Sequence, residues 1–252
     1  MSQQTISLTV DGTVAEITIN RPERRNALNH DAVVRLRELV EGLPDSVRVL
    51  ILTGADGHFC AGADLKELED LAFTRTLRGT LDALAELPVP TIAAISGSCM
   101  GLGTQLALAC DLRLASPDAR FAVPVAKLGL MVDHWTLQRL ALLAGQSAAR
   151  WLTLTARVMT ASQAHNLGFV NELTADEGAD VRVAARALAA EISALAPLAL
   201  SGTKLGLNQL EHLDLDEDGS YRAAFERAWG SQDLQEGQQA FAERRKPAFR
   251  GV

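Results

Sequence analysis

Residues 97–111 constrain the fold of this chain more than any other stretch, because closely spaced glycines there join an apolar run to a second apolar segment. The preceding run, residues 91–95, consists of small and β-branched residues, which is typical of a strand buried on both faces. Glycines at 97, 101 and 103 permit backbone angles and close approaches that a side chain would forbid. Residues 104–110 are apolar on nearly every side and predict a buried helix.

A glycine turn that leads into a buried helix directs free backbone N–H groups and the positive end of the helix dipole at one point. Such a point suits an anion, either a phosphate or the oxyanion of a polarised carbonyl. The alternative is a tight turn that only lets the helix pack. The glycine spacing is not G-x-G-x-x-G, so the stretch gives little support for a dinucleotide site.

Length and charge narrow the class of protein. A chain of 252 residues can bury a full core, and one large domain with appendages is expected. The formal net charge of -7 argues against a nucleic-acid partner, and an anionic ligand would need a local basic patch. No apolar run reaches the roughly 18 residues of a membrane span, and the N-terminal residues lack the apolar core of a secretory signal. Cys60, Cys99 and Cys110 show no metal-ligand spacing, so we expect no metal and a cytoplasmic location.

Strand and helix patterns alternate along the chain. Residues 6–10 and 14–19 alternate with period two around Asp11 and Gly12, which predicts a hairpin. Further strands are expected at residues 47–53, 91–95 and 111–116, and helices at 31–43, 77–87, 104–110, 136–143, 147–153, 180–195, 198–210 and 221–229. A short helix is also expected after Thr160 or Ser162, either of which suits an N-cap. Repeated strand–helix–strand units imply crossover connections and an α/β core.

Four motifs, in this order, resemble those of the enoyl-CoA hydratase/isomerase family, also called crotonases. They are Asn20-Arg-Pro-Glu-Arg-Arg-Asn-Ala-Leu28, Phe59-Cys-Ala-Gly-Ala-Asp-Leu65, the glycine stretch ending in Cys110-Asp-Leu-Arg113, and Leu167-Gly-Phe-Val170. The resemblance implies an α/β, crotonase-like spiral of ββα turns over residues 1–195. It also implies a C-terminal helical region at 196–252 that forms homotrimers or dimers of trimers. The implied ligand is an acyl-CoA thioester, with no separate cofactor.

The same resemblance assigns roles to single residues. The backbone N–H groups of Ala61 and Leu102 would surround the thioester oxygen, although Leu102 stands where the family usually has glycine. Arg24, Arg25 and Arg244 would meet phosphates; otherwise they are ordinary solvated charges. The rest of the implied acyl-CoA site consists of Ala27, Gly62, Ala63, Asp64, Leu65, Lys66, Gly101 and Trp135.

The sequence departs from the family at the two positions where a hydratase carries glutamates. Gln105 occupies one and Val125 the other. Hydration requires one group to deprotonate water and another to protonate the α-carbon. Glutamine has no usable proton equilibrium and valine has no polar atom. General acid–base catalysis is typically worth about 10² to 10⁴ in rate, so we expect little or no hydratase activity.

Asp133 is a further candidate. The segment around it resembles the dienoyl-CoA isomerase branch, in which an aspartate matches this position, although that branch also has acidic residues at the positions of Gln105 and Val125. Asp133 would equally serve as the N-cap of the following helix, and we favour the cap. Trp135 is expected to form a wall of the acyl pocket.

Three functions are therefore open. The first is an acyl-CoA-binding protein of fatty-acid and lipid metabolism, acting as a carrier, chaperone or sensor with a lipid-synthesis enzyme as a possible partner. The second is an enoyl- or dienoyl-CoA isomerase or lyase that uses Asp133. The third is a non-catalytic trimeric scaffold.

Overall fold

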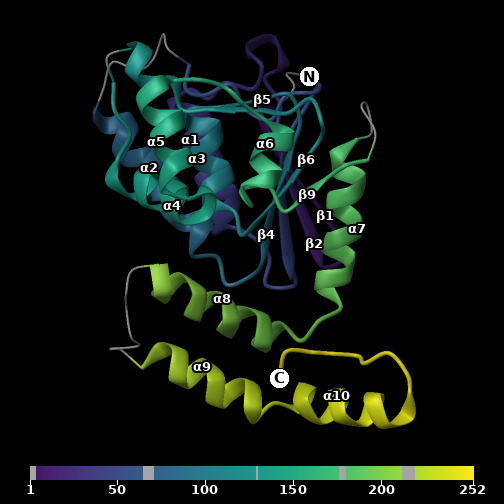
Figure 1. Cartoon of the computed structure of the whole chain (residues 1–252). Coiled ribbons are helices and arrows are strands. Elements are labelled where there is room, and N and C mark those ends of the chain that lie inside the picture. The colour runs from purple at the N-terminus through teal and green to yellow at the C-terminus, as the bar shows by residue number, and fades with distance from the viewer. Residues whose placement is uncertain (1–3, 65–70, 129, 176–179, 212–218) are drawn as a thin grey trace.

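A six-stranded sheet forms the centre of the molecule (Figure 1). The computed structural model describes residues 4–64, 71–128, 130–175, 180–211 and 219–252. The strand order in the sheet is β1-β2-β3-β4-β6-β9. These strands are β1 (Ile6–Asp11), β2 (Val14–Ile19), β3 (Val49–Gly54), β4 (Thr91–Ile95), β6 (Leu112–Ala115) and β9 (Glu172–Leu173).

The predicted hairpin is confirmed. β1 and β2 pair antiparallel, and Asp11 lies opposite Val14 across a turn in which Gly12 has a φ of 59°. All other pairs in this sheet are parallel, so each needs a crossover connection. The expected α/β core with crossovers is therefore present.

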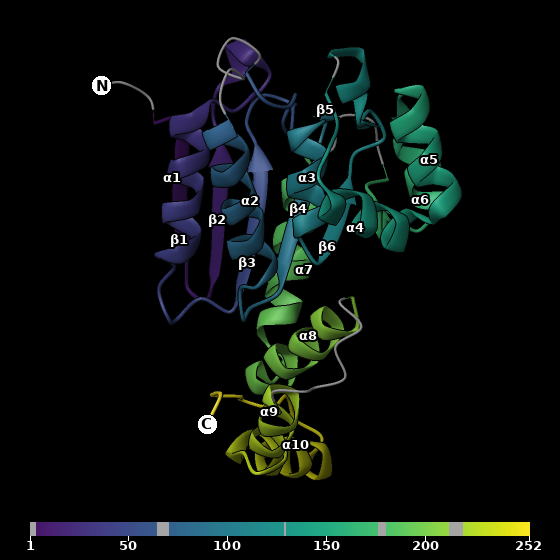
Figure 2. The ribbon, with the colours of Figure 1, turned by 90° about the vertical axis from the view of Figure 1, so that its left-hand side faces the viewer.

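Helices cover both faces of the sheet, which explains why its strands are almost continuously apolar. Leu50 and Leu52 of β3 belong to the larger core cluster, while their neighbours Val49 and Ile51 pack in a second cluster with α7 (Val181–Ser193). Figure 2 shows α7 behind the sheet and three helices in front of it. Those in front are α1 (His30–Glu41), α2 (Leu71–Ala85) and α3 (Leu102–Ala109).

A second, three-stranded sheet lies beside the first. It contains β5 (Ser98–Met100), β7 (Arg120–Ala122) and β8 (Met159–Thr160) in that order. The succession β4–β5–α3 is one ββα turn, the unit that the resemblance implies. The sequence analysis predicted only a glycine turn where β5 lies, because three residues are too few to show an alternating pattern.

The remaining helices of the body agree with the predictions to within a few residues at their ends. They are α4 (His134–Ala144), α5 (Gln146–Thr155) and α6 (Ala161–Asn166), with the short 3-10 turns η1 (Pro22–Arg24) and η3 (Pro124–Leu128). Of the two candidate caps for α6, Thr160 is the N-cap. It forms a capping box with Gln163, since each side chain accepts a backbone N–H of the other residue.

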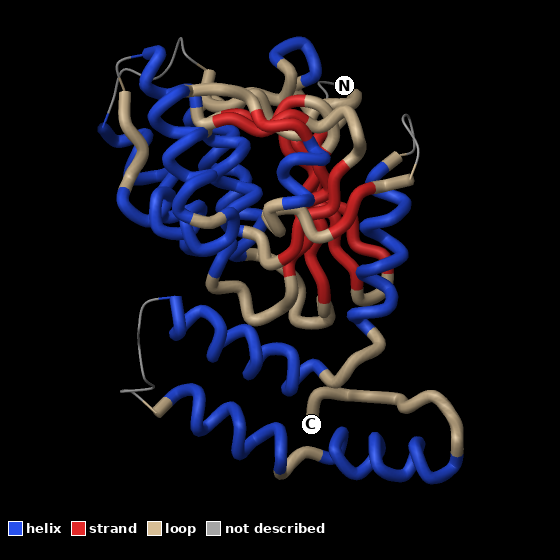
Figure 3. Tube along the Cα trace, viewed as in Figure 1, coloured by secondary structure: helices blue, strands red, loops and turns tan. Residues whose placement is uncertain are grey.

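The C-terminal helices lie together below the sheet in Figures 1 and 3. They are α8 (Pro197–Glu211), α9 (Ser220–Trp229) and α10 (Gln232–Glu243). The sequence analysis did not predict α10, whose polar sequence carries Gly237 at its centre. The boundary at 195/196 and the trimerising role of residues 196–252 stay predictions. In the part of the chain that is described, no single helix could span a membrane; α7 and α8 would together be long and apolar enough but are bent by 109°.

One buried ion pair attaches α8 to the sheet. Lys204 donates from Nζ to Asp111 Oδ2 at 2.7 Å and to the Val89 carbonyl at 3.0 Å. The same Asp111 oxygen accepts the Thr91 backbone N–H at 2.7 Å, at the start of β4. The Lys204 and Asp111 side chains are 8% and 25% exposed, so water screens this pair less than a pair on the surface.

We expect Lys204→Met to destabilise the protein by about 3 kcal/mol, the lower end for a broken buried pair, since Thr91 still donates to the aspartate. Urea denaturation measures this loss. Arg35→Met is the matched control, because it breaks an exposed pair with Glu38 and should change stability by less than about 0.5 kcal/mol. Equal losses in the two variants would contradict the assignment.

Candidate functional site

An apolar cavity of about 810 Å³ lies between α2, the start of α3, and the segment that includes η3. Phe73, Leu77 and Val132 contribute to its apolar wall. Residues singled out from the sequence also line it: Ala61, Ala63, Gly101, Leu102, Gln105, Val125 and Asp133. The structure thus brings residues from four separate parts of the chain to one cavity.

Two backbone N–H groups are free at this cavity. The Leu28 N–H donates to Gly62 O at 2.9 Å and the Asp64 N–H donates to Leu28 O at 2.8 Å. Since successive N–H groups of an extended segment point to opposite sides, the N–H of Ala63 points away from Leu28. Leu102 is the first residue of α3, where N–H groups lack intrahelical partners. Among the described residues, neither the Ala63 nor the Leu102 N–H has a recorded acceptor.

The prediction that Ala61 supplies one of these donors is wrong. The Ala61 N–H donates to the Arg25 carbonyl at 3.0 Å and is therefore engaged in the fold. Arg25 and Asn26 both have positive φ, 49° and 60°, and this left-handed turn places the Arg25 carbonyl against the segment. Ala63, two residues further on, carries the free N–H instead, while Ala61 remains in the cavity wall.

Gly103 allows the two donor segments to lie side by side. A Cβ on Gly103 would lie 2.2 Å from the Cys60 carbonyl oxygen, closer than any side chain permits. The Cys60 segment is in turn held beside β5, because Cys60 donates to Ser98 O and accepts from Met100 N, both at 2.9 Å. The first turn of α3 is thereby fixed against residues 60–63.

We expect Gly103→Ala to destabilise the protein by about 2 kcal/mol, because overpacking outweighs the better helix propensity of alanine. Gly237→Ala is the control: its Cβ would meet the Phe249 ring at an ordinary 3.5 Å, so helix propensity should raise stability by up to about 1 kcal/mol. Thermal unfolding of both variants tests the contrast. A neutral Gly103→Ala would show that the close approach is not needed.

Asn26 organises the loop that follows β2, and the sequence analysis did not single it out. Its side chain is buried; Nδ2 donates to Ala55 O at 2.8 Å and Oδ1 accepts from the Arg21 N–H at 2.8 Å. The signal in the sequence was an asparagine inside a basic motif, a residue type that tolerates a left-handed backbone. Arg24 and Arg25 beside it expose their side chains to solvent.

Gln105 and Val125, which stand where the resemblance implies hydratase glutamates, both line the cavity. Gln105 is 8% exposed, and its Nε2 donates to Thr136 Oγ1 at 2.8 Å. Val125 is half-buried on η3 and forms part of the cavity wall. Asp133 is the only carboxylate among the described cavity residues.

Asp133 is the N-cap of α4, as favoured from the sequence. Its Oδ1 accepts the Thr136 N–H at 2.9 Å, and Oδ2 lies 3.7 Å from Arg78 Nη1. The side chain is 40% exposed. It is therefore not the desolvated carboxylate that would best suit proton transfer along an acyl chain.

Comparison with known proteins identifies the family. The family model for enoyl-CoA hydratase/isomerase matches residues 9–252. The chain belongs to the enoyl-CoA hydratase/isomerase family. It is 40% identical over 265 residues to the probable enoyl-CoA hydratase echA6 of Mycobacterium leprae, covering 98% of this chain and 100% of that protein.

Solved structures of the family share the fold. The chain matches a putative enoyl-CoA hydratase/isomerase family protein from Hyphomonas neptunium with a TM-score of 0.92 and 33% identity, over 99% of this chain and 98% of that one. An enoyl-CoA hydratase from Mycobacterium tuberculosis H37Rv matches with a TM-score of 0.88 and 34% identity, over 99% and 100% of the two chains. The crotonase-like fold expected from the motifs is thus confirmed.

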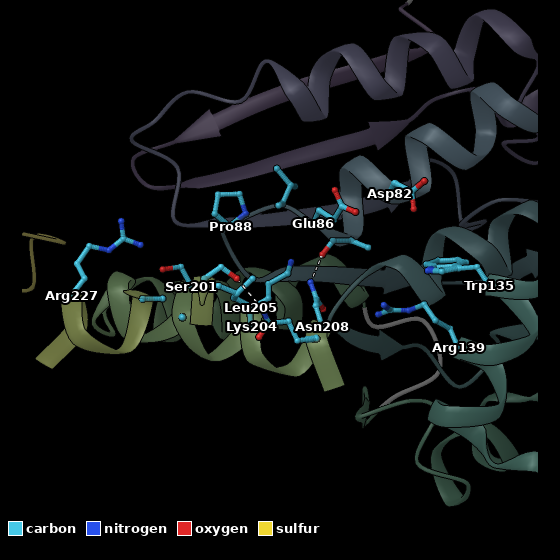
Figure 4. A pocket seen from close by; sticks show the side chains of 16 residues that line it. Asp82, Glu86, Pro88, Trp135, Arg139, Ser201, Lys204, Leu205, Asn208 and Arg227 are labelled. Carbon is cyan, nitrogen blue, oxygen red and sulfur yellow. Dashed lines mark hydrogen bonds between the residues drawn. The ribbon is translucent and has the colours of Figure 1, made fainter. Parts of the chain in front are cut away.

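Trp135 does not form a wall of the acyl cavity, so that prediction is wrong. It lines a second cavity, of about 430 Å³, between the body and helices α8 and α9. Figure 4 shows Trp135 and Arg139 on one side of it and Lys204 and Asn208 on the other. The Trp135 ring packs against two guanidinium groups, with Arg78 at 4.0 Å and Arg139 at 5.2 Å from its centroid. With these contacts the indole lies at the second cavity rather than at the acyl cavity.

Other predicted site residues lie apart from the cavity or outside the description. Leu65 and Lys66 fall outside the described residues. Arg244 follows α10, at the opposite end of the molecule from β5 in Figures 1 and 2, and does not reach the cavity of its own chain. Ala27 and Gly62 belong to the backbone pairing around Arg25 and Leu28.

The three cysteines are structural. All are buried, and burial raises the pKa of the Cys60 and Cys110 thiols to about 12 and that of Cys99 well above its usual value. They are therefore protonated near neutral pH. Among the described residues, no group of three or more His, Cys, Asp or Glu side chains is placed to hold a metal ion.

Proposed function

We propose that this protein binds acyl-CoA thioesters in the 810 Å³ cavity and has little or no hydratase activity. The observation that carries the proposal is the pairing of two free backbone N–H groups, of Ala63 and Leu102, with an apolar cavity. Two such donors suit a thioester oxygen, and the apolar wall suits an acyl chain. The cavity volume lies in the range of ligand sites, about 300 to 1,000 Å³.

Loss of hydration follows from the chemistry of the two replaced positions. Gln105 can hold a water molecule but cannot take its proton, and Val125 cannot deliver one. The backbone donors would still polarise a thioester, so binding survives the loss of proton transfer.

The CoA phosphates need positive charge, which the acidic chain supplies only locally. Arg24 and Arg25 are exposed on the loop whose backbone supports Ala61. Arg244 would reach the phosphates only from a neighbouring copy, as in the proposed trimer or dimer of trimers. We place the protein in cytoplasmic lipid metabolism, with a lipid-synthesis enzyme as a possible partner.

Calorimetry with octanoyl- and palmitoyl-CoA should give dissociation constants in the micromolar range, corresponding to about 8 kcal/mol. The same preparation should hydrate crotonyl-CoA at a negligible rate. Absence of heat, and of protection against unfolding, with either ligand would favour the non-catalytic scaffold.

The crotonyl-CoA hydration assay also tests whether Gln105 and Val125 occupy the positions of the two hydratase glutamates. A turnover at or above about 10² per second would show that Gln105 and Val125 do not occupy the catalytic positions. The double variant Gln105→Glu, Val125→Glu should raise the rate above background if the backbone donors are in place. Burying a carboxylate where valine stands reduces that gain, so the wild-type rate is the cleaner measurement.

Isomerisation is a second candidate because Asp133 lines the cavity. If Asp133 moves a proton, Asp133→Asn should abolish isomerisation of an enoyl- or dienoyl-CoA and leave acyl-CoA binding within about tenfold, or 1.4 kcal/mol. If it is only the cap, no isomerase rate exists, and the variant should differ little in stability, since asparagine caps as well as aspartate. We expect the second result.

A further inference from the structure

His58 supplies a hydrogen-bond acceptor to the backbone of β5. The Ser98 N–H donates to Nδ1 of His58 at 3.1 Å. Because a backbone N–H can only donate, Nδ1 carries no proton, and the neutral ring has its proton on Nε2. Gly97 makes room for the contact, since a Cβ at that position would lie 2.5 Å from Nδ1. The bond therefore requires one protonation state of the imidazole.

This contact replaces a regular bond in the pairing of β5. Cys60 donates to Ser98 O and accepts from Met100 N, as in a parallel pair of strands. One step earlier, the same pattern would place the Ser98 N–H on the His58 carbonyl. That carbonyl accepts Asn26 Nδ2 instead, at 2.5 Å. The His58 side chain thus satisfies a backbone donor that the pairing leaves over.

β5 lies between the two backbone donors of the cavity. It pairs with the segment that carries the Ala63 N–H, and it leads directly into the start of α3, which carries the Leu102 N–H. A change in how β5 is held at Ser98 therefore alters the spacing of these two N–H groups. His58 is not among the described residues that line the cavity, so it acts on a ligand only through this backbone.

We propose that His58 is a proton-operated latch, which holds β5 when the ring is neutral and releases it when the ring is charged, so that acid weakens acyl-CoA binding. Protonation puts a second N–H at Nδ1, which then faces the Ser98 N–H and leaves both donors without an acceptor. Histidine side chains gain a proton between about pH 8 and pH 5. The stability that the bond contributes is present at the upper end of this range and is lost as the pH falls. His58 is thus a positioning residue.

The charges around His58 do not take over the role of this bond. Several described elements pack near the ring, and most of their charged groups have partners of their own. Asp118 binds the Ser116 hydroxyl, Arg120 donates to two backbone carbonyls, and Asp180 pairs with Arg182. Among the described residues, no charged side chain bonds to the ring. The titratable and charged groups of these elements are Asp56, Cys60, Arg21, Arg25, Cys99, Asp118, Arg120, Asp180 and Arg182.

His165 makes the opposite kind of contact and provides a control. Its Nδ1 lies 3.1 Å from the Val170 carbonyl oxygen. A carbonyl can only accept, so this contact needs a proton on Nδ1, which the charged imidazole offers as well as one neutral tautomer does. Acid therefore breaks the His58 bond and leaves the His165 bond in place.

The first test compares the thermal unfolding of the full-length wild type and His58→Asn at about pH 8 and about pH 5.5. In asparagine, Oδ1 takes the place of Nδ1 as an acceptor and does not titrate. On acidification the wild-type Tm should fall by roughly 2 to 4 °C more than that of His58→Asn, the effect of one net hydrogen bond. His165→Asn should follow the wild type. His58→Leu, which has no acceptor at either pH, should show the small response of His58→Asn.

The second test measures octanoyl-CoA binding by calorimetry at the same two pH values. The phosphate monoester of CoA also gains a proton in this range, so each protein is read by the ratio of its two dissociation constants. The wild-type ratio should exceed that of His58→Asn by roughly 3- to 10-fold. His165→Asn should again give the wild-type ratio.

Hydrogen exchange of the wild type gives a reading that does not depend on any variant. Between the two pH values, the protection factor of the Ser98 amide should fall roughly 3- to 10-fold more than that of Ile51 in β3. Equal changes at the two amides would overturn the proposal.

The outcomes separate the latch from the proposed function, on which its effect on ligands rests. If octanoyl-CoA binds at neither pH, the proposed function fails, and the latch is judged by unfolding and exchange. If the wild type and His58→Asn respond equally to acid, the latch is refuted whether or not the ligand binds. A difference in Tm without a difference in the binding ratio refutes the control of binding.

Discussion

The first turn of α3 lies directly against the Cys60 carbonyl, and the cavity depends on that contact. Only a residue without a Cβ fits at position 103, so the helix start and the extended segment 60–63 are brought to van der Waals distance. The helix supplies a free N–H at its first turn, and the segment supplies another by the alternation of its backbone. Neither donor requires a particular side chain. A leucine at position 102 therefore alters the shape of the cavity without removing the polar group that faces it.

The strands that build the sheet were predictable because their side chains are buried on both faces or alternate clearly. The motifs, taken together, also predicted the family and the two positions, Gln105 and Val125, that line the cavity. The wrong donor at Ala61 has a different origin. Which N–H in residues 60–64 is free depends on how Arg25 and Leu28 pair with that segment. This pairing is a long-range contact that no local sequence pattern reports. For the same reason Trp135 was misplaced, since its position follows from Arg78 on α2 and Arg139 on α4.

Several residues of the motifs serve the fold rather than a ligand. Asp111 of the Cys110–Arg113 motif binds Lys204 and Thr91, which joins the C-terminal helices to the sheet. Arg113 is 2% exposed and donates to the carbonyls of Cys110 and Phe169, at 2.8 and 2.6 Å. The match to the family in these motifs is therefore evidence for a shared scaffold. It carries no information about whether the chemistry of the site is retained.

This separation of scaffold from chemistry bears on Gln105 and Val125, which stand where the resemblance implies two glutamates. Two ionised carboxylates inside an apolar cavity would carry a large free-energy cost of desolvation. Valine at 125 removes one such charge and adds apolar wall, while glutamine at 105 is neutral and satisfied on one side by Thr136. Both changes lower the free-energy cost of keeping the cavity dry around an acyl chain. Under the proposed function, the two residues that offer no usable proton are thus the same ones that favour holding a thioester without turning it over.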